Sequence, residues 1–268
     1  MRILFKLTLI TLLIALSIVY GIRQGSFEPS LIPQHLSVAI TPYLLNQDHP
    51  IKEKLDQLFS KERLLESFKA METAGFEILK TNSELNVAKH PELPGYVFKF
   101  YLDSHDNEPR FKKLKLKENF ISENYLWLLR INGAIRVQKI IDEYCFERHF
   151  KVSKGWIYEL PKYPKASGPY PKHSIFIEKD MGVLSDPENE ACYRQKFDKE
   201  LLKAFYTLLK ESGLYDSVYI DNNPFCTDGK IAFVDTEEYD RKPIPYEKLL
   251  PFFSPEMQIF WKCLIKEP

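Results

Sequence analysis

The spacing of apolar residues along the sequence changes at Gly75, from a spacing typical of a helix to one typical of strands. Over residues 51–74, apolar side chains recur every three or four positions, which predicts a helix that ends at Gly75. Later in the chain, short apolar runs bounded by turn residues predict strands, and longer periodic runs predict helices. The predicted strands are 76–80, 85–88, 96–102, 152–158, 174–178, 218–220 and 230–234, and the later predicted helices are 118–131, 134–145, 197–209 and a tail from 246. Because the strands and helices do not alternate regularly, this order predicts an α+β fold.

The chain begins with an apolar segment. Residues 3–22 make 20 positions in which Lys6 is the charged side chain, and about 20 apolar residues are enough to span a membrane. No A-x-A sequence offers a signal-peptide cleavage site, so we predict an uncleaved transmembrane anchor, with a cleaved signal peptide as the alternative. Arg2 and Lys6 outweigh Arg23, which predicts a single-pass membrane protein whose body lies outside the cytoplasm.

The predicted organisation is therefore an anchor or signal peptide over 1–22, a proline-containing linker or packing arm over 23–50 and a folded domain over 51–268. The 37 basic and 37 acidic side chains balance. This balance argues against nucleic acid as a partner, because a broad nucleic-acid surface needs an excess of positive charge. The four cysteines form no C-x-x-C pair, which argues against a zinc ribbon and predicts mostly free, half-buried thiols.

The most informative segment is 216–239, D-S-V-Y-I-D-N-N-P-F-C-T-D-G-K-I-A-F-V-D-T-E-E-Y. Two polar clusters flank a turn over 227–229, and Asp235 follows the apolar run 231–234. We expect Asn222 and Asp235 to face each other across a hairpin. Carboxylate and amide oxygens are hard ligands that suit Mg²⁺ held partly by the phosphates of a substrate.

These residues resemble the catalytic and metal-binding loops of the protein kinase-like family. That family places an Asn five residues after a catalytic Asp and a metal-binding Asp beyond a short hairpin. Asn222 and Asp235 are 13 positions apart, as that pattern leads us to expect. The sequence V-D-T-E-E-Y resembles the I-D-F-E-Y of choline and aminoglycoside kinases, and G-Y-V-F-K, which ends at Lys99, resembles the V-A-I-K strand.

The resemblance implies a two-lobed protein kinase-like fold, with an N-lobe over about 51–178 and a truncated C-lobe over about 179–268, behind the transmembrane helix. It implies that Mg²⁺ and ATP bind between the lobes. Lys99 would hold phosphates and be positioned by Glu123. Asn222 and Asp235 would hold the metal, and Asp216 would orient the acceptor hydroxyl as the catalytic base.

The sequence also departs from the family pattern. No G-x-G-x-x-G precedes Lys99, so the phosphate cradle is missing or built differently. Asp216 lies six residues before Asn222, and the strictly aligned position is Ser217. Either a one-residue insertion keeps Asp216 as the base, or the base is lost. Glu118, at the start of the predicted helix, is the alternative to Glu123.

Three functions follow from this pattern. The first is a divergent kinase-like phosphotransferase that uses Mg-ATP on an unidentified acceptor. The second is a non-catalytic pseudokinase, a membrane-tethered interaction module with a protein partner, which the missing glycine loop and the spacing of Asp216 favour. The third is a structural envelope or lumenal protein without nucleotide affinity. If the body lies outside the cytoplasm, the supply of ATP there is a problem, which favours the second and third functions.

Overall fold

The computed structural model describes residues 34–81, 85–114 and 122–266. The helices are α2 (Gln34–Ile40), α3 (Lys52–Phe59), α4 (Phe68–Thr73), α5 (Glu108–Lys113), α6 (Glu123–Glu143), α7 (Asp186–Lys196), α8 (Lys199–Ser212) and α9 (Pro255–Leu264). The strands are β1 (Glu77–Thr81), β2 (Asn86–Lys89), β3 (Tyr96–Phe100), β4 (Phe150–Val152), β5 (Gly155–Glu159), β6 (Ser174–Lys179) and β7 (Ile231–Phe233). Short 3₁₀ helices lie at η1 (Thr41–Tyr43), η2 (Leu64–Glu66), η4 (Ile220–Asn222) and η5 (Tyr246–Phe252).

Five strands form an antiparallel sheet in the order β1-β2-β3-β6-β5. One hydrophobic core covers this sheet and the helices α3 and α4, and it includes Leu55, Phe59, Phe76, Phe98, Tyr158 and Ile175. The short strands β4 and β7 pair in parallel, apart from the larger sheet. A second core lies among α7, α8 and α9 and includes Tyr193, Phe205, Leu208, Phe225, Phe233 and Trp261.

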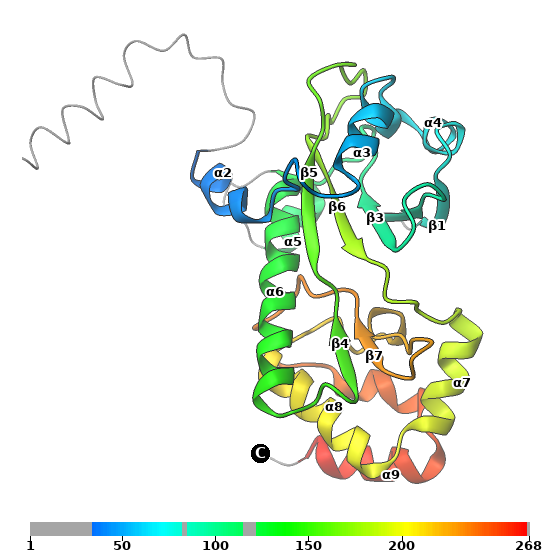
Figure 1. The fold of residues 1–268 in the computed structure, drawn as a ribbon. Helices are drawn as coiled ribbons and strands as arrows, with labels where there is room; N and C mark the ends of the chain where they lie inside the picture. Colours follow the sequence, from blue (N-terminus) through cyan, green and yellow to red (C-terminus); the bar gives the residue numbers. More distant parts are fainter. Residues whose placement is uncertain (1–33, 82–84, 115–121, 267–268) are drawn as a thin grey trace, which may run out of the picture. The chain divides into compact units, whose positions relative to one another are not determined.

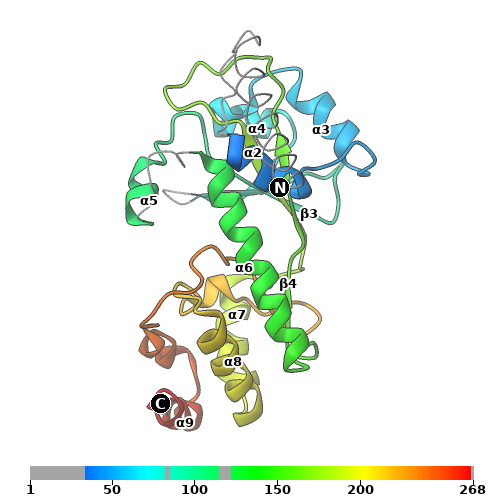
Figure 2. The same cartoon turned by 90° about the vertical axis from the view of Figure 1, so that its left-hand side faces the viewer.

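Helix α6 connects the sheet to the helices of the second core. It contacts β5 and β6 of the sheet, and further along it contacts β4 and α8. Figures 1 and 2 show it running from the level of the sheet toward α8. The hydroxyl of Ser122 accepts a hydrogen bond from the backbone N–H of Asn124 and caps the start of the helix. Residues on α6 can therefore reach the space between the sheet and the second core.

The predicted elements differ from the observed ones in several places. Helices α2, α5 and α7 were not predicted, and the predicted strand 152–158 is divided into β4 and β5. The segment 51–74 is not one helix, because it is divided into α3, η2 and α4. The two helices predicted on either side of Gly133 are one continuous helix, α6. The predicted strand 218–220 is instead a turn that leads into the 3₁₀ helix η4. Periodicity located the apolar faces of these segments, but tertiary contacts decided where each helix ended.

The fold class predicted for the whole chain is wrong, although its α+β part agrees with the structure. In the described ranges no helix is long and apolar enough to cross a membrane. The segment 3–22, to which the transmembrane prediction applies, lies outside these ranges. The residues 35–268 form one compact unit. All four cysteines are free thiols, as predicted, but Cys145 and Cys263 are exposed rather than half-buried.

Gly133 has a specific packing role in α6. A Cβ at this position would overlap the backbone carbonyl oxygen of Thr236, so the segment after β7 lies directly against the helix here. The hydroxyl of Thr236 donates a hydrogen bond of 2.6 Å to the carbonyl oxygen of Arg130, which fixes the same approach. The helix keeps a glycine in its interior because a side chain there would displace this segment.

We expect Gly133→Ala to lower the free energy of unfolding by about 2 kcal/mol, because overpacking at this contact outweighs the higher helix propensity of alanine. The measurement is urea unfolding followed by circular dichroism. Ile135→Ala, at an exposed position of the same helix, is the control and should change stability by less than about 0.5 kcal/mol. A stabilised Gly133→Ala variant would contradict the close approach of Thr236.

Candidate functional site

A cavity of about 470 Å³ lies between the sheet and the segment that contains Asp216, Asn222 and Asp235. Such a volume is within the usual range for small-molecule sites. Strands β1, β2, β3 and β6 and helix α6 contribute to its wall. Its apolar lining comes from Leu79, Leu85, Val87, Val97, Met181, Val183, Leu184, Pro224 and Val234. The cavity therefore combines an apolar wall with charged side chains, an arrangement that suits a ligand with both a flat apolar part and charged groups.

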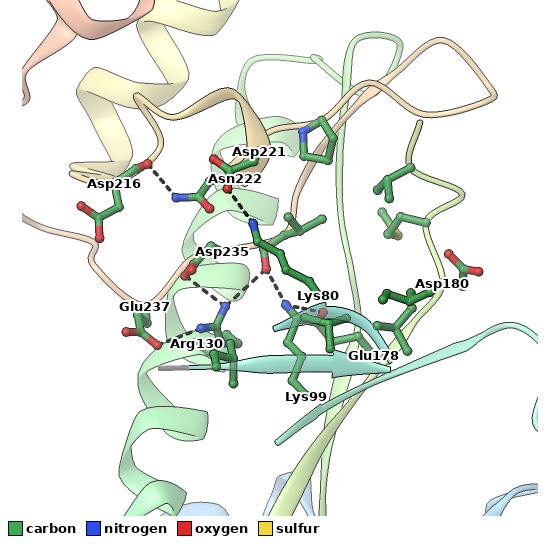
Figure 3. A pocket seen from close by; sticks show the side chains of 18 of the residues that line it. Lys80, Lys99, Arg130, Glu178, Asp180, Asp216, Asp221, Asn222, Asp235 and Glu237 are labelled. Carbon is green, nitrogen blue, oxygen red and sulfur yellow. Dashed lines mark hydrogen bonds and ion pairs between the residues drawn. The ribbon is translucent and has the colours of Figure 1, made fainter. Parts of the chain in front are cut away.

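Four of the five site residues predicted from the sequence line this one cavity. They are Lys99, Asp216, Asn222 and Asp235, and Figure 3 shows them around the same space. Lys99 comes from β3, whereas the other three come from the segment between α8 and the residues just after β7. The fold thus brings together residues more than a hundred positions apart in the sequence.

Lys99 is buried and held by two oxygen atoms. Its Nζ lies 2.7 Å from Oε2 of Glu178 on β6 and donates a hydrogen bond of 2.6 Å to the carbonyl oxygen of Val234. Burial lowers the pKa of Lys99, and the carboxylate of Glu178 counteracts that effect. The ammonium group is therefore fixed in position beside the end of β7.

Glu123 has a different role from the one predicted. Its Oε1 accepts hydrogen bonds from the backbone N–H groups of His173 and Ser174, the second at 3.0 Å. These bonds tie the start of α6 to the start of β6. The ion pair predicted between Glu123 and Lys99 is replaced by the one with Glu178. The alternative, Glu118, lies outside the described residues.

Asp235 lies two residues beyond β7 and is engaged by a guanidinium group. Nη1 of Arg130 donates to Oδ1 of Asp235 at 3.0 Å, and Nη2 donates to Oε2 of Glu237 at 2.9 Å. The side chain of Arg130 is 3% exposed and that of Asp235 is 30% exposed. Burial alone would raise the pKa of Asp235, but Arg130 and Lys99 outweigh it and hold that pKa below its ordinary value. Asp235 is therefore an anion already paired with a buried cation.

A hydrogen bond joins the side chain of Asn222 to the backbone of Asp216. The side-chain amide nitrogen of Asn222 donates to the carbonyl oxygen of Asp216 at 2.8 Å. Burial together with the charge of the neighbouring Glu238 raises the pKa of Asp216 to about 6. Glu238 is itself paired with Arg110 at 2.9 Å. At neutral pH Asp216 is thus mostly ionised, but its midpoint of ionisation lies closer to neutrality than that of an ordinary aspartate.

The oxygen donors fit a divalent cation only in part. Asn222 uses its amide nitrogen for the contact with Asp216, so its Oδ1 is the atom that can ligate a metal. Oδ1 of Asp235 is bonded to Arg130, which leaves Oδ2 for that purpose. Across the part of the chain that the structure describes, no three His, Cys, Asp or Glu side chains are grouped so as to hold a metal ion. A Mg²⁺ ion here would therefore rely on one carboxylate, one amide and the oxygens of a ligand.

The sequence analysis missed three functional groups of this cavity, Arg130, Glu178 and Glu237. Two of them carried a signal. Arg130 is a charged residue on the apolar face of a predicted helix, beside Trp127, and Glu178 directly follows the apolar run 175–177. Charged residues in such positions are buried only when they are paired, so each one predicts a partner, although not which one.

Comparison with family models, curated proteins and solved structures gave no match.

We expect Arg130→Leu to lower the free energy of unfolding by about 3 kcal/mol. Removing the guanidinium leaves the buried carboxylate of Glu237 and the partly buried one of Asp235 without this counter-charge. Urea unfolding at pH 7.5 measures the change. Arg136→Leu, on the same helix, removes a more exposed ion pair with Asp240 and should cost less than about 1 kcal/mol. Equal losses in the two variants would contradict a buried, stabilising role for Arg130.

The raised pKa of Asp216 predicts a pH dependence of stability. Between about pH 4 and pH 6 the folded chain binds the proton of Asp216 more tightly than the unfolded chain does. The stability from this proton is therefore present below pH 4 and is lost as the pH rises through about 6. Asp216→Asn mimics the protonated form, so the variant should be more stable than the wild type at pH 7.5 and equal to it near pH 4. Urea midpoints across this range test the expectation, and a difference that does not vary with pH would contradict it.

Proposed function

We propose that this protein binds a nucleoside triphosphate, ATP, in the cavity and transfers its terminal phosphoryl group to a hydroxyl acceptor. The observation that carries the proposal is that Lys99, Asn222 and Asp235 line one cavity together with Asp216. These residue types are the ones that phosphoryl transfer needs, namely a cation for phosphates, oxygen ligands for a metal and a carboxylate for the acceptor. The apolar wall suits a flat, weakly polar base.

Each group has a role in this proposal. Lys99 and Arg130 supply positive charge near the end of β7, where the phosphates would lie. Mg²⁺, held by Oδ1 of Asn222 and Oδ2 of Asp235, would neutralise part of the phosphate charge. Asp216 would orient the acceptor hydroxyl and accept its proton, which it does best above its pKa of about 6.

The second candidate is binding without phosphoryl transfer, in a protein that acts as an interaction module. Two observations favour it. Arg130 already neutralises Asp235, and the neighbouring charge of Glu238 acts on Asp216. The candidates differ in turnover, because only the first produces ADP. Incubating the full-length chain with Mg-ATP and measuring ADP release distinguishes them.

Nucleotide binding is tested by thermal unfolding of the full-length chain with and without Mg-ATP. A ligand at 100 times its dissociation constant adds about 2.7 kcal/mol to stability, which raises the melting temperature by several degrees. Lys99→Met combined with Glu178→Gln removes both charges of the buried pair, so the fold does not retain an unpaired carboxylate. We expect this double variant to lose the ATP-induced shift.

Lys199→Met, on the surface of α8, is the control and should keep the full shift. If the wild type shows no shift at millimolar Mg-ATP, the proposed function is wrong. A shift retained by the double variant would leave nucleotide binding in place but remove Lys99 from it.

A further inference from the structure

Strand β1 contains an irregularity that changes which side chains face the cavity. Ile78 lies opposite Ala88 of β2, but Lys80 lies opposite Val87, so β1 has one extra residue, Leu79, between these pairs. Side chains directly opposite each other on neighbouring strands lie on the same face of the sheet. Ala88 belongs to the core beneath the sheet, with Ile78 packed against that core, whereas Val87 lines the cavity.

The extra residue therefore moves Lys80 to the cavity face. In a regular strand, positions 78 and 80 share a face, and Lys80 would point into the hydrophobic core with Ile78. A bulge of this kind re-aims a side chain, and such bulges occur beside functional sites. Lys80 indeed lines the cavity, together with Leu79.

Lys80 forms an ion pair across the cavity with Asp221 of η4. Its Nζ lies 2.7 Å from Oδ2 of Asp221, and both residues line the cavity (Figure 3). The two side chains are 48% and 47% exposed. Asp221 immediately precedes Asn222. The ion pair thus joins the sheet to the segment that carries the candidate metal ligand.

This ion pair can open so that Lys80 takes another anionic partner. Water competes with ion pairs between half-exposed side chains, so little stability is lost when such a pair opens. Lys99 and Arg130, in contrast, are buried and held by carboxylates. A polyphosphate that enters the cavity would offer Lys80 a partner with more negative charge than one carboxylate, and it would be repelled by Asp221.

We propose that Lys80 binds the phosphates of the ligand and that Asp221 competes with them, so that the ion pair opens when a polyphosphate enters. Lys80 then supplies, from a bulged strand, a contact that a glycine-rich loop would otherwise give, and the sequence has no such loop before Lys99. The inference rests on the proposed function, because it assigns a further binding residue to the same site.

The test compares two single substitutions in the full-length chain, with affinity for ATP measured by isothermal titration calorimetry. Lys80→Gln removes the phosphate-binding charge and should weaken ATP binding about five- to tenfold. Asp221→Asn removes the competitor and should tighten ATP binding about threefold. If the ion pair is purely structural, both substitutions break the same contact. They should then change ATP affinity in the same direction.

Two controls make the comparison specific. Lys199→Gln and Glu256→Gln break an exposed ion pair between α8 and α9 and should leave ATP affinity within about twofold of the wild type. Adenosine, which has no phosphate, should bind the wild type, Lys80→Gln and Asp221→Asn with affinities that agree within about twofold.

The outcomes separate this inference from the function on which it rests. Opposite changes in ATP affinity, absent for adenosine, support it. Changes in the same direction, no change beyond twofold, or equal changes for adenosine overturn it while leaving ATP binding established. If the wild type binds no ATP, the proposed function and this inference both fail.

Discussion

The buried guanidinium of Arg130 is the interaction on which the site depends. It extends from the middle of α6 and contacts Asp235, Glu237 and the carbonyl oxygen of Val234, all just after β7. The helix also contacts the sheet and α8. One side chain therefore fixes the segment after β7 relative to both cores. A charge buried to this extent is stable only with partners, so Arg130 and its two carboxylates must be kept or lost together.

The cavity is highly charged but electrically balanced. Seven basic and seven acidic side chains line it. Lys99 with Glu178 and Arg130 with Asp235 and Glu237 form buried pairs, and Lys80 with Asp221 forms an exposed one. The buried pairs hold their geometry because separating them would leave a desolvated charge, whereas the exposed pair can change partners. The same charges thus provide a rigid wall on one side of the cavity and an adaptable edge on the other.

Asp216 and Glu238 are neighbouring acidic residues, and the charge of Glu238 affects the pKa of Asp216. A carboxyl group with a pKa of about 6 can accept a proton at neutral pH, and burial together with the charge of Glu238 is what raises the pKa of Asp216 to that value. Arg110, Lys113 and Arg241 each pair with Glu238, and they keep that second carboxylate charged.

The sequence by itself located most of the strands and four of the residues that line the cavity. Alternation and turn residues located β1, β2, β3 and β6 within one or two positions, because strand formation depends on short-range patterns. The 13-residue spacing brought Asn222 and Asp235 to one cavity, since a short hairpin connects them. Only the tertiary structure decided the partner of Lys99, the continuity of α6 through Gly133 and the face on which Lys80 lies. Those features depend on contacts between segments about 80 to 140 residues apart, or on a one-residue shift in strand pairing, and neither is encoded in a local pattern of hydrophobicity.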